Sequence, residues 1–101
     1  MIEKLEDLWW GKDFNSYLYH LRANEFKIRR GYQLLNFLQT IEVPEGENID
    51  KELVKKLWMI PLFIELCKKK MDTKLNHKDY ANFIKLDTDI RHEIQRILGM
   101  P

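Results

Sequence analysis

Apolar residues recur along most of this chain at intervals of three and four, the spacing that is typical of amphipathic helices. The first such segment, residues 2–10, has Leu5, Leu8 and Trp9 on one face, and Gly11 can end it in a left-handed cap. The pattern therefore predicts a short helix at the start of the chain.

A much longer helical stretch is predicted from an N-cap at Asp13 to about Ile41. Apolar residues recur there every seven positions and lie along one stripe: Phe14, Leu21, Ile28 and Leu35. Asn24 and Gly31 are the positions at which this stretch can kink. Packing of the stripe against the rest of the domain is favoured over a coiled coil.

An acidic loop, residues 42–48, divides the chain into two helical halves, because Pro44 and Gly46 interrupt the periodic pattern. Asn48 or Asp50 can cap the helix that follows, and a break or kink is expected where Pro61 arrives. The helix that starts at Pro61 is expected to bury Leu62, Phe63, Leu66 and Cys67.

The last segment, residues 76–98, predicts two short helices, from about His77 to Lys85 and from about Thr88 to Leu98, with Gly99 ending the second. Asn76 can cap the first of these. Such a pair suggests a helix-turn-helix, and Ala81, Leu86 and Ile94 fall at its usual apolar positions. However, Lys85 stands where the turn usually has glycine, and Asp87 and Asp89 lie where phosphates would approach. Two packed helices are therefore the favoured interpretation.

Composition supports a single domain over residues 1–101. The chain is 45% hydrophobic and 33% charged, with four glycines and three prolines, which favours helices and excludes a disordered chain. The fold class that we expect is all-α, a small bundle of about five to six helices with one long central helix. A single cysteine allows no intramolecular disulfide, and neither a secretory signal nor a membrane-spanning run is visible, so we expect a cytoplasmic protein.

Catalytic and metal-binding motifs are missing from the sequence. The three histidines, His20, His77 and His92, are far apart and have no second ligand at metal spacing. There is no glycine-rich phosphate loop and no nucleophile elbow. Cys67 lies on an apolar face, where a buried, inert thiol is expected. The sequence therefore predicts a protein that is not an enzyme and that needs no cofactor, metal or small-molecule substrate.

Adjacent tryptophans indicate a protein partner. Trp9 and Trp10 point about 100° apart on a helix, so burying both rings within one monomer is difficult. An exposed tryptophan is a common interface anchor, although a bundle that covers both rings is equally compatible with the pattern. The favoured function is a non-enzymatic interaction module, a small helical subunit or adaptor of a larger assembly or of a homo-oligomer. Its candidate contacts are Trp9, Trp10, Phe14, Leu21, Ile28 and Leu35.

Two groups of basic residues support an alternative function, that of a nucleic-acid-associated subunit that contacts phosphates. The candidate residues are Arg22, Lys27, Arg29 and Arg30 in the first half, Lys55, Lys56, Lys68, Lys69, Lys70 and Lys74 in the second, and Arg91 and Arg96 in the last segment. A formal net charge of +1 argues against a strong nucleic-acid binder but allows a local patch. Solvated helix surfaces explain the same charges more simply.

Overall fold

Five helices make up the fold in the computed structural model, which describes residues 2–9, 16–43 and 49–99, and no strand occurs among these residues. The predicted all-α class is confirmed. The helices are α1 (Ile2–Trp9), α2 (Tyr17–Arg22), α3 (Ile28–Thr40), α4 (Lys51–Lys74) and α5 (His77–Leu98).

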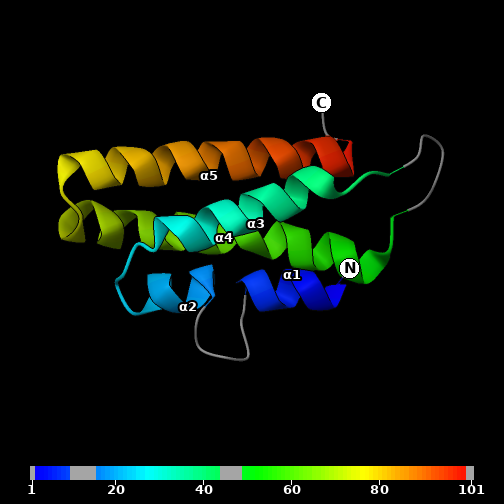
Figure 1. Ribbon diagram of the computed structural model, residues 1–101, viewed down its shortest axis with the longest axis horizontal. Helices are drawn as coiled ribbons and strands as arrows, with labels where there is room; N and C mark the ends of the chain where they lie inside the picture. Colours follow the sequence, from blue (N-terminus) through cyan, green and yellow to red (C-terminus); the bar gives the residue numbers. More distant parts are fainter. Residues whose placement is uncertain (1, 10–15, 44–48, 100–101) are drawn as a thin grey trace.

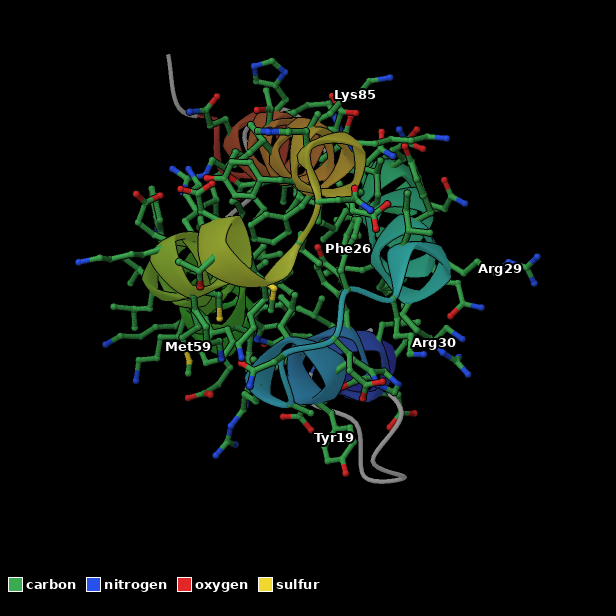
Figure 2. All side chains as sticks on the ribbon, turned by 90° about the vertical axis from the view of Figure 1, so that its left-hand side faces the viewer. Tyr19, Phe26, Arg29, Arg30, Met59 and Lys85 are labelled. Carbon is green, nitrogen blue, oxygen red and sulfur yellow. The ribbon has the colours of Figure 1, made fainter. Side chains whose placement is uncertain are left out.

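The helices form a bundle around one apolar core. Figure 1 shows α3, α4 and α5 running lengthwise, with α1 and α2 following one another along the side away from α5. Seen end-on in Figure 2, α4 and α3 lie on opposite sides of the bundle. Every helix contributes fully buried side chains to the core, among them Leu5, Tyr17, Leu34, Leu57 and Phe83.

Local capping chemistry defines the ends of the two longest helices, as predicted. The Asp50 carboxylate accepts a hydrogen bond from the Glu52 amide (2.8 Å) at the start of α4. The Asn76 side chain accepts one from the Asp79 amide (2.8 Å) at the start of α5. Gly99 ends α5 in the left-handed conformation, at φ 72°.

The predicted long helix over residues 13–41 is wrong, because residues 23–27 separate α2 from α3. Asn24 adopts the left-handed conformation (φ 65°), which asparagine tolerates better than most residues, and this ends α2. The break falls at one of the two positions that the sequence marked for a kink. Ser16 caps α2 through its hydroxyl, whereas the proposed cap at Asp13 lies outside the described residues.

Gly31, the other position at which a kink was expected, lies within α3 and is buried, and its lack of a side chain allows close packing. A Cβ atom at this position would overlap the buried Leu86 side chain and lie 3.0 Å from the Tyr17 ring. Glycine therefore allows α3 to approach α5 closely, with the Tyr17 ring packed against it.

Two predicted interruptions do not occur. α4 continues through the buried Pro61, and α5 continues through residues 85–88, where a turn was expected. Burial of Ile60 and Pro61 on the core side of α4, and of Leu86 in α5, outweighs the local preference for a break. The long helix of the bundle is therefore α4, which has 24 residues, and the predicted helix-turn-helix is absent.

Within the described residues, none of the helices is both long enough and apolar enough to cross a membrane.

Candidate protein-binding surface

α4 carries apolar side chains on two opposite faces. Its inner face packs in the core and consists of Leu53, Leu57, Ile60, Pro61, Ile64, Cys67 and Met71. At about 100° per residue, Leu62 lies almost diametrically opposite the centre of this set. The outer face points away from the rest of the bundle and needs its own explanation.

Three apolar side chains form a line on that outer face, which we call the α4 ridge: Trp58, Leu62 and Leu66. Their spacing of four residues places them one above the other over about 12 Å of helix. Leu66 is 80% exposed, Leu62 64% and Trp58 40%. Met59, at 41% exposure, lies beside the ridge, and Figure 2 shows it on the outer side of α4.

Lysines lie at both ends of the α4 ridge. Lys55 and Lys69 each lie seven residues from Leu62, so they continue the line of the ridge at its two ends. α4 as a whole contains seven lysines and three acidic residues, a net charge of +4 in a chain whose net charge is +1. The rest of the chain is therefore net acidic, and the basic charge is concentrated on the helix that exposes the ridge.

A cluster of ion pairs, which we call the Asp87 cluster, fixes α4 against α5. The Asp87 carboxylate is buried, and it contacts Lys68 Nζ at 3.2 Å and Arg91 Nε at 3.1 Å. Glu65 joins the same two cations, at 3.0 Å from Lys68 and 2.6 Å from Arg91 Nη2. Two cations thus bridge two carboxylates, one from each helix, so the buried charge of Asp87 is compensated.

The contacts within this cluster shift its ionisation. Hydrogen bonds from Lys68 and Arg91 lower the pKa of Glu65. The Glu65 hydrogen bond raises the pKa of Lys68, with Asp87 adding to the effect. Partial burial lowers the pKa of Arg91, but the contacts with Asp87 and Glu65 outweigh it and raise the pKa overall. All of these shifts favour the charged forms of Glu65, Lys68 and Arg91.

The predicted partner contacts lie mostly in the chain's own core. Trp9, Leu21 and Leu35 are buried, and the Trp9 ring packs edge-on against Phe63 at 5.7 Å between centroids. Ile28 is half-buried. Trp9, Leu21 and Leu35 therefore build the bundle, and the expectation of Trp9 as an exposed anchor is wrong. Two further candidates, Trp10 and Phe14, lie outside the described residues.

Sequence reasoning missed the α4 ridge. Leu62 and Leu66 were expected in the core, and the structure places both at the surface. The signal that could have revealed them is the apolar pattern of α4, which covers two opposite sides of the helix instead of one stripe. Pro61 obscured this signal, because it suggested two short helices whose faces could not be compared.

Several predicted phosphate contacts are engaged within the chain. Besides Lys68 and Arg91, Lys56 pairs with Glu6 at 2.8 Å. Arg96 donates to the carbonyl oxygens of residues 38 (3.0 Å) and 41 (2.9 Å) and so caps the end of α3, while it also pairs with Glu93. Weaker contacts hold Lys27, Arg30 and Lys55, to Glu25, Gln33 and Glu52 respectively. Among the described residues, Arg22, Arg29, Lys69, Lys70 and Lys74 make no ion pair.

The two basic groups do not form one stripe. Figure 2 shows Arg29 and Arg30 on the side of the bundle opposite α4. An open hollow of about 500 Å³ lies at the start of α3, lined by His20, Phe26, Lys27, Ile28, Arg29 and Arg30. No side-chain hydrogen bond caps α3 there. The basic residues thus lie on separate surfaces of different character.

Two groups with catalytic potential, the Cys67 thiol and the Tyr17 hydroxyl, belong to buried residues. Cys67 is buried, as predicted, and this burial raises the pKa of its thiol. Burial also raises the pKa of Tyr17, and Asp87 adds to the effect. Among the residues that the structure describes, no three His, Cys, Asp or Glu side chains are grouped as metal ligands. Asp87, which the comparison with a helix-turn-helix placed where phosphates would approach, lies inside α5 and is buried.

Comparisons of this chain with protein-family models, with curated proteins and with solved structures give no match.

Proposed function

We propose that this protein is a non-enzymatic interaction module that binds a partner protein through the α4 ridge. The observation that carries the proposal is the exposure of Leu62 and Leu66 in line with Trp58 on a helix whose opposite face already fills the core. Exposed leucines in line contribute little to the stability of the monomer, because the burial of apolar surface is what stabilises a fold.

The ridge has the features of a helix-docking surface. A line of side chains four residues apart fits into the groove between two such lines on another helix. Tryptophan is enriched among the residues that dominate binding energy, and Trp58 stands at one end of the ridge. The Asp87 cluster and the inner face of α4 hold the backbone in place, so little conformational entropy is lost when a partner binds.

Nucleic-acid binding, the alternative, has weaker support. Lys56, Lys68, Arg91 and Arg96 already contact acidic or carbonyl groups of the chain itself. Arg29 and Arg30 lie on the side of the bundle opposite α4, the helix that carries Lys69, Lys70 and Lys74. Phosphates, moreover, offer no apolar surface to cover Leu62 and Leu66.

Selection from a displayed library of amphipathic helices tests the proposal. The library fixes leucine at three positions spaced four residues apart and randomises the other positions among charged and small polar residues. Helices selected against the purified protein should lose at least about tenfold in affinity for the Leu62→Asp, Leu66→Asp variant, because two carboxylates would then lie under the apolar contact.

A charge-matched control is available on α5, where Thr88 and Gln95 are exposed and lie on another side of the bundle. The Thr88→Asp, Gln95→Asp variant adds the same two charges and should bind the selected helices as the original chain does. Circular dichroism establishes that both variants remain helical. Equal loss of binding in the two variants, or no loss in either, would show that the α4 ridge is not the binding surface.

A further inference from the structure

The charges around the α4 ridge identify the kind of partner that it fits. We propose that its occupant is an amphipathic helix of another protein. This helix carries three apolar side chains spaced four residues apart, and a carboxylate about two turns before and another about two turns after the central apolar side chain. This inference rests on the proposed function and adds the chemistry of the partner.

Charge complementarity carries the inference. Lys55 and Lys69 lie in line with the ridge, seven residues on either side of Leu62. Lys69 makes no ion pair with any described residue, and Lys55 has only a 4.0 Å contact with Glu52 across exposed side chains. The long, flexible side chains of Lys55 and Lys69 therefore let a helix that crosses the ridge at Leu62 meet an ammonium group near both ends of its contact, where a carboxylate is stabilised and a cation is repelled.

The acidic residues near the ridge do not cancel this preference. Glu65 lies at the edge of the ridge, but Lys68 and Arg91 hold its carboxylate at 3.0 Å and 2.6 Å. Glu52 contacts Lys55 at 4.0 Å, and Asp72 lies about 80° around the helix from Leu62, off the line of the ridge. The field that a partner meets along the ridge is therefore basic at both ends.

A second copy of the same chain fits this surface poorly. Pairing the whole ridge with itself in antiparallel orientation matches Trp58 with Leu66 and centres the contact on Leu62. That register brings Lys55 of each copy beside Lys69 of the other, so like charges meet at both ends of the contact. Parallel pairing brings each lysine beside its own counterpart, with the same result.

A lipid surface also fits less well than a helix. Helices that lie in a membrane interface present a continuous apolar face along most of their length. The outer face of α4 is apolar over only about 12 Å, and the lysines that interrupt it stand in the line of the ridge itself. A short apolar contact with charged ends is the geometry of a helix crossing another helix.

The experiment compares charge variants of one selected helix. The probe is a labelled peptide of about 20 residues, the length of α4, that carries the three leucines and glutamate at the two end positions; its matched form has lysine there. In low-salt buffer the glutamate form should bind at least about tenfold more tightly, because two attractions replace two repulsions, and high salt should narrow the difference. The Lys55→Glu, Lys69→Glu variant should reverse the preference.

The outcomes separate this inference from the proposed function. Binding that requires Leu62 and Leu66 but shows no preference between the two peptides would overturn the acidic partner and leave the interaction module intact. Binding of both peptides that ignores Leu62 and Leu66 would overturn both. Self-association in light scattering that the Leu62→Asp, Leu66→Asp variant abolishes would assign the ridge to a second copy instead. Ridge-dependent binding to vesicles of phosphatidylserine and phosphatidylcholine would assign it to a membrane.

Discussion

The two faces of α4 have similar composition and opposite surroundings. On the inner face, Ile60 and Ile64 are fully buried, whereas on the outer face Leu62 and Leu66 are mostly exposed. The inner residues contact neighbouring helices, and these contacts stabilise the bundle. The outer residues contact little of the chain itself. Apolar character alone therefore does not distinguish a residue that a fold requires from one that is available to a partner.

The edges of α4 belong to neither face and carry the charges that fix its orientation. On one edge, Glu65 and Lys68 reach Arg91 and the buried Asp87 of α5. These contacts hold α4 against α5 in the orientation that turns its inner face toward the core. Exposure of the ridge thus depends on a polar interaction at the edge as well as on packing in the core.

Truncation on the inner face should have the largest effect on stability. Ile64→Ala removes a fully buried side chain and should lower the free energy of unfolding by about 2–5 kcal/mol, because lost apolar burial and an unfilled cavity add together. Urea unfolding followed by circular dichroism measures the loss. Leu62→Ala is the matched truncation on the outer face. If Ile64→Ala lowered the free energy of unfolding by less than Leu62→Ala does, the assignment of the two faces would be contradicted.

Removing the buried charge at the edge should have the next largest effect. Asp87→Asn leaves Lys68 and Arg91 without their buried carboxylate and should cost about 1–3 kcal/mol, less than a fully buried pair because both cations are partly exposed. The same unfolding experiment on Asp87→Asn, Lys68→Met tests the coupling. If the double variant costs the full sum of the single variants, the two residues do not interact.

Acid should weaken the ion pairs between α4 and α5, and the resulting loss of stability should depend on Glu65. The pKa of Glu65 is lowered below its ordinary value of 4.5, so its contribution to stability is present at neutral pH and is lost as the pH falls through that lowered pKa. Glu65→Gln should therefore lower the melting temperature slightly at neutral pH and leave it unchanged at a pH below the pKa. If the difference in melting temperature between the variant and the original chain grew as the pH fell, this interpretation would be contradicted.

Features that depend on local chemistry could be predicted from the sequence. Asn76 begins a helix and Gly99 ends it where the sequence placed them, and Asp50, one of two caps that the sequence allowed, begins α4. A cap needs only its own side chain or backbone conformation and the amides next to it. Asn24 is a further case, since the left-handed residue that ends α2 lies where a kink was marked.

Features that depend on packing could not be predicted. Pro61 and residues 85–88 were expected to interrupt helices, but burial against other helices keeps α4 and α5 continuous. Trp9 was a candidate for the surface, and the choice between surface and core depended on neighbours such as Phe63 that lie far away in the sequence. The site itself was missed for the same reason, because only the complete bundle decides which apolar face of α4 is left uncovered.

The outer face should show the smallest effect on stability and the largest effect on binding. Leu62→Ser, Leu66→Ser replaces two exposed side chains and should change the free energy of unfolding by no more than about 0.5 kcal/mol at each position, since the fold buries little of either. The same variant should lose affinity for the selected helices by about tenfold or more, because each leucine that is buried in a complex contributes on the order of 1.5–3 kcal/mol. Urea unfolding and fluorescence anisotropy measure the two quantities on one preparation. A destabilisation comparable to that of Ile64→Ala would mean that the ridge is already packed in the free protein, and the distinction between the two faces would then be lost.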